Sequence, residues 1–209
     1  MQAIDYLKYI VDEIHSTVFA TVDQEGQPVT CAIDMMDCDE NGLYFLTAKG
    51  KSLYRRLKKN AYVAFTAMKG EDTMSRVAVS VRGRAEELGP ERLPALFAKK
   101  PYMAKIYPDE ASRSALTVFR ICEGTGEWFD LSKTPVERAS FSFGGAAEPD
   151  NGYFVTGRCI SCKLCYAKCP QQCIDITRKP AFIRQENCLH CGNCYEVCPA
   201  RAVERRGTV

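Results

Sequence analysis

Eight cysteines near the C-terminus form two runs with identical spacing, and this spacing is the strongest chemical signal in the sequence. Each run follows the pattern C-x2-C-x2-C-x3-C-P. The runs are Cys159, Cys162, Cys165 and Cys169 before Pro170, and Cys188, Cys191, Cys194 and Cys198 before Pro199. Thiolates at these intervals bind the irons of iron–sulfur clusters. A zinc site would use paired C-x2-C knuckles and would not explain the third and fourth cysteines. The sequence therefore predicts two iron–sulfur sites.

On the basis of these runs, residues 151–209 resemble the two-cluster ferredoxins of bacteria, a small ferredoxin-like α+β domain. In that family the fourth cysteine of each run binds the cluster held by the other run. The resemblance implies one [4Fe-4S] cluster on Cys159, Cys162, Cys165 and Cys198. It implies a second on Cys188, Cys191, Cys194 and Cys169. A segment of this size buries little core, so the clusters are expected to supply folding energy.

Two neighbours of the runs bear on these sites. Cys173 follows Cys169 by four residues and is expected to be a small buried residue and not a ligand. His190 lies inside the second run, where a surface position or a contact beside the cluster is expected in place of ligation.

The remaining composition is typical of a globular protein in a reducing compartment. Of twelve cysteines, the four outside the runs are scattered and offer no framework for disulfides. The first 14 residues mix charged with apolar side chains, unlike a signal peptide, and no window approaches the roughly 20 apolar residues of a membrane helix. The expected location is the cytoplasm.

Charge is unevenly distributed along the chain. From residue 150 onward there are nine Lys and Arg against five acidic residues, whereas residues 1–149 hold 19 basic and 21 acidic groups. A basic tail can indicate a nucleic-acid partner, but four thiolates leave an iron–sulfur cluster with net negative charge. We therefore interpret the basic residues as counter-charge for the clusters and expect neither a nucleic-acid nor a membrane partner.

Upstream of residue 132 the chain consists mostly of short alternating runs, which are typical of strands. Strands are predicted at residues 17–22, 29–35, 43–47, 62–68, 74–88, 116–121 and 127–131. Helices are predicted at residues 3–14, from about 51 to 60, and at 90–106. Glu123-Gly124-Thr125-Gly126 predicts a hairpin turn between the last two strands. About seven strands with two or three helices predict a mainly β fold with α, arranged as a closed or nearly closed antiparallel barrel.

The segment between barrel and cysteine runs looks like a linker. Residues 132–150 lack apolar periodicity and carry two prolines and a Gly-Gly pair. We expect a barrel domain at residues 1–140, a linker at 141–150 and a cluster domain at 151–209.

Four motifs occur together in residues 10–140. They are Phe19-Ala20-Thr21-Val22 with Gly26-Gln27-Pro28, Leu43-Tyr44-Phe45-Leu46-Thr47 before Lys51-Ser52, Asn60-Ala61-Tyr62-Val63-Ala64, and Val79-Ser80-Val81-Arg82-Gly83-Arg84-Ala85-Glu86. As a set they resemble the flavin-binding split-barrel family that includes pyridoxamine 5′-phosphate oxidase. The resemblance implies a homodimer that binds FMN in clefts between the subunits. It also implies that the FMN phosphate is held by Thr47, Lys49, Lys51 and Ser52.

The segment from Thr47 to Ser52 also suits an anion on physical grounds. A strand that ends at Thr47 and a helix that begins near Ser52 gather free N–H groups, the positive helix end, a hydroxyl and two ammonium groups. On composition alone, Ser52 is equally well a helix cap and the lysines a solvated face. Trp128, the only tryptophan, is either a core residue of the last strand or a wall of the flavin pocket.

The chain also departs from the oxidase. The arginines and the histidine that bind pyridoxine phosphate there have no match, and the cluster domain replaces the C-terminal region that carries part of that site. Pyridoxamine oxidase activity is therefore not expected, and the chain looks more like the flavin-reductase-like relatives of anaerobes.

The leading hypothesis is an FMN-dependent oxidoreductase in which two [4Fe-4S] clusters exchange electrons with FMN. A one-electron partner would then drive reduction, or accept electrons from oxidation, of a small substrate. The alternative is a non-enzymatic electron carrier or redox sensor that uses the barrel for dimerisation. A third hypothesis keeps the enzyme but replaces FMN by a deazaflavin or haem.

No catalytic residue is predicted. His15 and His190 are the only histidines, and no Ser-His-Asp or Cys-His set is evident. His15 is expected to be structural, and the sequence does not identify a substrate.

Overall fold

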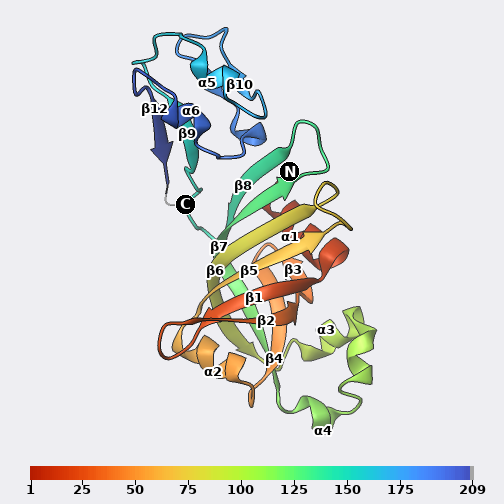
Figure 1. The fold of residues 1–209 in the computed structure, drawn as a ribbon. Helices are drawn as coiled ribbons and strands as arrows, with labels where there is room; N and C mark the ends of the chain where they lie inside the picture. Colours follow the sequence, from red (N-terminus) through yellow and green to blue (C-terminus); the bar gives the residue numbers. More distant parts are fainter. Residues whose placement is uncertain (208–209) are drawn as a thin grey trace. The chain divides into compact units, whose positions relative to one another are not determined.

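A computed structural model of the protein describes residues 1–207, which form two compact units. The first unit contains Met1–Lys69, Ala78–Glu127 and Phe141–Ala147. The second contains Gly70–Val77, Trp128–Ser140 and residues 148–207. Strands dominate, with short helices between them, as the sequence predicts (Figure 1).

The chain opens with a helix whose apolar face is buried. Helix α1 (Ala3–Tyr9) continues into the π-helical segment η1 (Ile10–Ile14), so the helix predicted at residues 3–14 is confirmed. Ile10 and Val11 are buried on the same face as Leu7, as the helical spacing requires. The helix ends at His15, whose backbone φ is 70°.

The first unit is built on one eight-stranded sheet. Its strands follow the order β2-β1-β5-β6-β7-β4-β3, and β8 pairs with β7. The strands are β1 (Ser16–Val22), β2 (Pro28–Asp34), β3 (Asp37–Asp39), β4 (Gly42–Ala48), β5 (Tyr62–Lys69), β6 (Val77–Gly89), β7 (Leu116–Asp130) and β8 (Glu137–Phe143). The pairings β1 with β2, β1 with β5, β4 with β7 and β3 with β4 are antiparallel.

Phenylalanines fill the interior that the sheet encloses. Phe19 of β1 lies 5.0 Å from Phe45 of β4 and 6.1 Å from Phe65 of β5, measured between ring centroids. Phe119 of β7 stacks on Phe45 at 5.6 Å. Because side chains alternate along each strand, these rings all come from the inward positions, and their burial joins four strands into one core.

A helical segment covers the other face of β4 and β7. Helix α3 (Leu93–Lys99), the 3-10 helix η2 (Pro101–Lys105) and helix α4 (Glu110–Arg113) lie together in Figure 1. Leu96 and Phe97 of this segment pack on Tyr44, Leu116 and Val118. Alternate residues of β4 and β7 are therefore buried on both faces of the sheet, which explains the nearly continuous burial of these two strands.

Helix α2 (Ser52–Lys59) follows β4 and is anchored by its apolar side. Leu53 and Leu57 are buried, and the Tyr54 ring meets Phe119 edge to face at 6.0 Å. The Tyr54 hydroxyl donates to Glu87 at 3.2 Å. The basic side chains of α2 other than Arg56 are thereby left exposed, and the helix predicted at this place is confirmed.

The predicted hairpin at residues 123–126 is wrong. Residues 116–130 form the single strand β7, and neither Gly124 nor Gly126 has a positive φ. A Cβ on Gly126 would lie 2.2 Å from the Phe141 ring, and one on Gly124 would lie 2.6 Å from the Arg82 carbonyl. These glycines permit close approach of neighbouring strands and do not make a turn.

The linker predicted at residues 132–150 is also partly wrong. Residues 137–143 form β8, so residues 141–143 of the expected linker belong to a strand. Residues 131–136 and 144–151, on either side of β8, lack helix and strand. β8 pairs with β7, and such pairing stabilises a segment whose own apolar pattern is weak.

The second unit is small and internally repeated. Strand β9 (Gly152–Val155) pairs with β12 (Val203–Arg206), and β10 (Ile174–Asp175) pairs with β11 (Phe182–Ile183). Each cysteine run contains one four-residue helix, α5 (Leu164–Ala167) or α6 (Asn193–Glu196), and the 3-10 helix η3 (Gln185–Asn187) precedes the second run. Among the described residues, no helix is long and apolar enough to cross a membrane.

Candidate functional site

The last cysteine of each run joins the first three cysteines of the other run. One cavity is lined by Cys159, Cys162, Cys165 and Cys198. A second cavity is lined by Cys188, Cys191, Cys194 and Cys169, together with Cys173. The structure thus brings together the two sets that the sequence predicts, and it does so by crossing the runs.

Backbone N–H groups point at several of these sulfurs. The N–H of His190 donates to Cys188 Sγ at 3.4 Å, and that of Ala202 donates to Cys198 Sγ at 3.2 Å. Backbone N–H groups of Ala181 and Ser161 lower the pKa of Cys159. Such bonds favour the thiolate, which is the form that binds metal.

Burial acts against the thiolate at other positions of the two cavities. It raises the pKa of Cys194 to about 12, and it also raises the pKa of Cys165. These two thiols need a positive partner to lose their protons at neutral pH, and a bound metal supplies one.

No set of three or more His, Cys, Asp or Glu side chains in the described part of the chain is arranged to hold a single metal ion. A four-iron cluster makes a different demand, because each thiolate binds a different iron. Its ligands therefore surround a cavity, as the two cysteine sets do here.

Cys173 is buried, as expected, and it also contacts two cysteines of the second set. Its sulfur lies 3.5 Å from Cys169 Sγ. A hydrogen bond from the Cys173 thiol lowers the pKa of Cys188 to about 6, while the pKa of Cys173 itself is raised. Cys173 is therefore the thiol donor and Cys188 the thiolate acceptor. At the matching position of the second run the chain has Ala202.

The hairpin between β7 and β8 is held to the second cysteine run. Asn187 Nδ2 donates to the Val136 carbonyl at 3.0 Å, and a guanidinium nitrogen of Arg138 donates to the Cys188 carbonyl at 3.3 Å. The Val136 N–H donates to Gln171 at 3.4 Å. The sequence did not identify Val136 and Arg138 because both lie in the segment expected to be a linker.

His190 is half-buried beside the second cavity. Its ring meets Tyr153 edge to face at a centroid distance of 6.4 Å. Burial, with a smaller effect of the Arg138 charge, lowers the pKa of His190 to about 4. It is thus a neutral residue packed beside the cysteines, as opposed to a surface histidine.

The second candidate site lies in the first unit, where β4 leads into α2. Thr47 is 2% exposed, and its hydroxyl has no hydrogen-bond partner among the described residues. Lys49, Lys51 and Ser52 are exposed. Lys51 occupies the N-cap with an extended backbone and makes no side-chain cap, so the first N–H groups of α2 are available to a ligand.

One residue that the sequence did not assign to this site, Arg56, enlarges it. The Arg56 guanidinium donates to Thr21 at 2.7 Å. Burial raises the pKa of Cys31, and the nearby charges of Arg56 and Lys51 oppose that shift. Arg56 therefore adds a cation near Lys51. It escaped sequence reasoning because a basic residue within an amphipathic helix looks like part of the solvated face.

Ser52 differs from the predicted cap. Its hydroxyl accepts a hydrogen bond from Arg55 at 3.1 Å and does not cap α2. Trp128 is buried near the end of β7, in the second compact unit, whereas residues 47–52 belong to the first. Its assignment to the flavin pocket stays a prediction.

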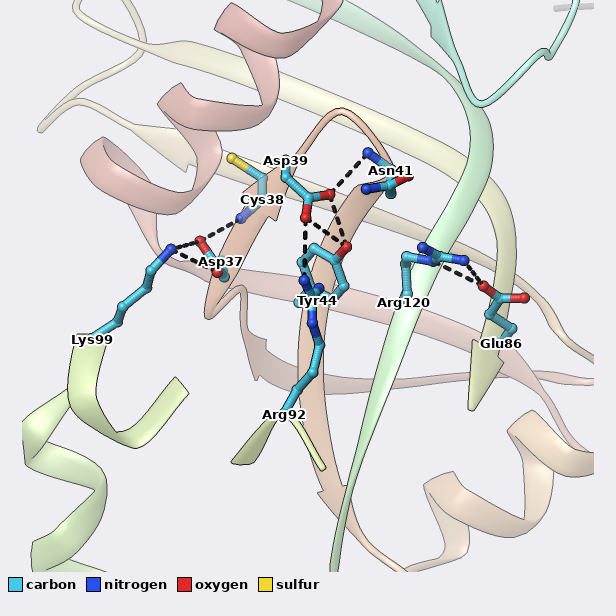
Figure 2. Close-up of polar contacts among 9 residues, drawn as sticks. All are labelled: Asp37, Cys38, Asp39, Asn41, Tyr44, Glu86, Arg92, Lys99 and Arg120. Atoms are coloured by element: carbon cyan, nitrogen blue, oxygen red, sulfur yellow. Dashed lines mark hydrogen bonds and ion pairs between the residues drawn. The ribbon is translucent and has the colours of Figure 1, made fainter. Parts of the chain in front are cut away.

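A separate polar network in the first unit is balanced in charge (Figure 2). The Tyr44 hydroxyl donates to Asp39 at 2.8 Å, and the Arg92 guanidinium lies 4.1 Å from the centre of the Tyr44 ring. The other pairs in the network are Arg92 with Asp39, Lys99 with Asp37, and Arg120 with Glu86. Each cation has a carboxylate partner, so these pairs hold β3 to both ends of α3 and β7 to β6, and they leave no unpaired charge among these residues for an anion.

His15 also takes part in a structural contact, as expected. Its Nε2 lies 2.7 Å from the Tyr102 hydroxyl, which donates to Asp34 at 2.9 Å. This chain of contacts joins the end of η1 to β2 and η2.

Two family models match separate parts of the chain. A family model described as pyridoxamine 5′-phosphate oxidase matches residues 4–128, and one described as a 4Fe-4S dicluster domain matches residues 158–202. No curated protein matches the chain significantly.

Several solved structures share the fold. A NimC/NimA family protein from Clostridium acetobutylicum is 17% identical, with a TM-score of 0.54 over 68% of this chain and 90% of that chain. A protein from the same organism related to general stress protein 26 of B. subtilis, in the pyridoxinephosphate oxidase family, is 17% identical, with a TM-score of 0.51 over 66% and 94%.

A heme binding protein from Mycobacterium smegmatis is 16% identical, with a TM-score of 0.51 over 67% of this chain and 58% of that chain. At such identities the likeness shows the fold alone. The expected fold, a split barrel followed by a small iron–sulfur domain, is confirmed.

Replacing Cys173 by Ala, the residue at the matching position of the other run, should leave iron content unchanged and lower the reduction potential of one cluster. The reason is that a hydrogen bond to a ligand sulfur stabilises the reduced, more negative cluster. Iron analysis and a potentiometric titration followed by electron paramagnetic resonance measure both quantities. Loss of about four irons per chain would instead make Cys173 a ligand.

Proposed function

The chain belongs to the pyridoxamine 5′-phosphate oxidase family, and we propose that it is a redox protein that passes electrons between two [4Fe-4S] clusters and FMN. The outcome is the reduction or oxidation of a small substrate. The observation that carries the proposal is the lining of the two cavities, each with three cysteines of one run and the last of the other. The match to a 4Fe-4S dicluster domain supports it.

The proposed ligands follow the cavities. One cluster takes Cys159, Cys162, Cys165 and Cys198, and the other takes Cys188, Cys191, Cys194 and Cys169. Cys173 is left as a donor to sulfur, because the second cavity already offers four cysteines without it.

The residues at the start of α2 fit the phosphate of FMN. A buried hydroxyl without a partner costs roughly 1–3 kcal/mol, and a phosphate oxygen would satisfy that of Thr47. Lys49 and Lys51 supply charge, and the N–H groups at the start of α2 and the Ser52 hydroxyl supply donors. These are the residues that would hold FMN, with Arg56 as a further cation.

When bound, FMN exchanges electrons singly with one-electron donors and in pairs with a substrate. The chain's own contribution is to bind and orient. The buried end of β4 shields Thr47 from water, the uncapped start of α2 would offer its first N–H groups to a phosphate, and N–H groups around the cysteines favour the thiolates. No residue is assigned to proton transfer.

We also propose that the first unit pairs with a second copy of itself. One face of β1 and β5 is exposed and apolar, with Val18, Tyr62 and Met68 each 50–56% exposed. Val18 pairs with Thr66 and Ala20 with Ala64 across the two strands, so these side chains form one surface. Monomeric proteins rarely expose continuous apolar faces of this kind.

Paired cysteine variants test the crossing of the runs. Cys162→Ala and Cys198→Ala lie in different runs but line the same cavity, so each single variant and the double variant should keep about four of about eight irons per chain. The double variant Cys162→Ala/Cys191→Ala, whose positions line different cavities, should keep almost none. Iron is quantified after anaerobic reconstitution. Equal losses in the two double variants would contradict the proposed ligand sets.

Comparing two flavins tests the phosphate site. Thr47→Val and Lys51→Ala should each weaken FMN binding about tenfold, because each removes a partner of a charged group. Riboflavin has no phosphate, so its affinity should not change. Fluorescence titration measures both affinities, with Lys59→Ala at the other end of α2 as the control.

A parallel loss of riboflavin affinity would place the effect outside the phosphate site. If the iron-loaded wild-type protein binds neither flavin, the FMN proposal fails, and an electron carrier without flavin becomes the better interpretation.

Sedimentation equilibrium tests the pairing of two copies. The wild-type protein should have twice the chain mass, and Val18→Lys should shift it toward the monomer by burying a charge in an apolar interface. Ile106→Lys is the matched control, because Ile106 is 61% exposed outside this face. A monomeric wild-type protein would refute the dimer.

A further inference from the structure

The two cysteine runs are related by an internal repeat, but their loops differ in exposure. In the first run every residue from 160 to 164 is exposed, including Ile160 at 62% and Leu164 at 48%. In the second run the matching residues 189, 190 and 192 are only partly exposed. The loop of the first run therefore offers apolar side chains to solvent around the exposed Cys162.

Ser161 and Lys163 of this loop both have a positive φ, and only Lys163 has a glycine at the matching position of the second run. Lys163 has a φ of 63°, in the left-handed region, where the matching residue of the second run is Gly192 with a φ of 82°. Placing a residue with a Cβ in this region costs about 1 kcal/mol or more, and glycine would avoid the cost. The chain thus keeps a lysine side chain where the backbone favours glycine.

The two cavities also differ in the charged residues that line them. Lys163 and Arg178 line the first cavity, and the Lys179 charge acts on the thiol of Cys159. The second cavity has no Lys or Arg in its lining. Arg178 also lies over the Phe182 ring, which is 46% exposed. Because Arg178 Nε also lies 3.7 Å from a carboxylate oxygen of Asp175, the positive charge of this rim comes mainly from Lys163 and Lys179. Exposed apolar groups lie beside these two lysines.

The hairpin of β7 and β8 makes hydrogen bonds to the second cysteine run. Arg138 donates to the Cys188 carbonyl, and Asn187 donates to the Val136 carbonyl. Residues 160–164 of the first loop are all exposed. The second run is thus engaged within the protein, whereas the loop of the first run is open to a partner.

We propose that the first loop is the docking surface of a small acidic electron-carrier protein. The surface consists of residues 160–164 with Arg178 and Lys179. Positive charge attracts an acidic partner and orients it, and the apolar side chains supply a small area to bury. A cluster bound by the exposed Cys162 would lie next to this surface, which matters for electron exchange and not for a nucleic acid or a lipid.

This proposal rests on the proposed function, because it requires a cluster in the first cavity. The step moves one electron. The reduced carrier is oxidised by one electron, the oxidised cluster is reduced by one, and no bond is made or broken.

The test uses the full chain with both clusters reconstituted and reduced flavodoxin, an acidic one-electron donor, as the probe. Stopped-flow absorbance measures the second-order rate constant of cluster reduction. Lys163→Glu/Lys179→Glu should lower this constant about tenfold at low ionic strength, and the difference should vanish near 0.5 M salt, where screening is short-ranged. Reduction by dithionite, a small reductant, should change far less.

Two further variants separate docking from other effects. Arg184→Glu makes the same charge change at an exposed residue that lines neither cavity, and it should change the rate constant less than twofold. Lys163→Gly removes one charge and relieves the backbone, so it should slow the reaction about threefold while keeping the fold.

The outcomes distinguish the two proposals. Absence of eight irons in the wild-type protein refutes the proposed function. With eight irons present, equal slowing by Arg184→Glu, or no slowing by the Lys163 variants, overturns docking and leaves the basic residues as counter-charge. The Lys163 variants could instead lose binding to anionic phosphatidylserine vesicles while their rate constant stays unchanged. That result would overturn docking of an electron carrier in favour of a membrane surface.

Discussion

The second unit depends on the crossing of its two cysteine runs. Its strands are two to four residues long and its two α-helices four each, so hydrogen bonding within elements does little to fix the chain. Its core includes cysteines of both cavities beside a few aliphatic residues. Cross-linking both runs through metal would join residues about 20 to 40 positions apart, and such closure removes entropy from the unfolded chain.

The first unit obtains its order from apolar burial instead. Phenylalanines from four strands meet in its interior, and α3 with η2 buries the outer side of β4 and β7. Against this packed background, the end of β4 is an exception, since it buries a hydroxyl without a partner next to an uncapped helix. A buried polar group left unpaired in a well-packed structure is a reasonable place to expect a ligand.

The internal repeat of the second unit lets one half serve as the reference for the other. Ala202 shows that Cys173 is not needed to fill its position, and Gly192 shows that Lys163 is not needed for its backbone. Next to a cysteine cavity, one run therefore has Cys173 where the other has alanine, and Lys163 where the other has glycine. The two residues have different surroundings: the Cys173 thiol contacts the sulfur of Cys169, whereas the Lys163 side chain is exposed to solvent.

The cysteine spacing by itself determined the two iron–sulfur sites, because a ligand run needs only local intervals, and apolar alternation determined the mainly β fold of the first unit. Only the tertiary structure decided that Gly124 and Gly126 lie inside one long strand, since their role depends on how closely Arg82 and Phe141 approach. The same holds for β8, whose residues form a strand through pairing with β7. The added cation Arg56 and the asymmetry between the two cysteine loops also required the structure, because exposure and proximity arise from packing between segments that are distant in sequence.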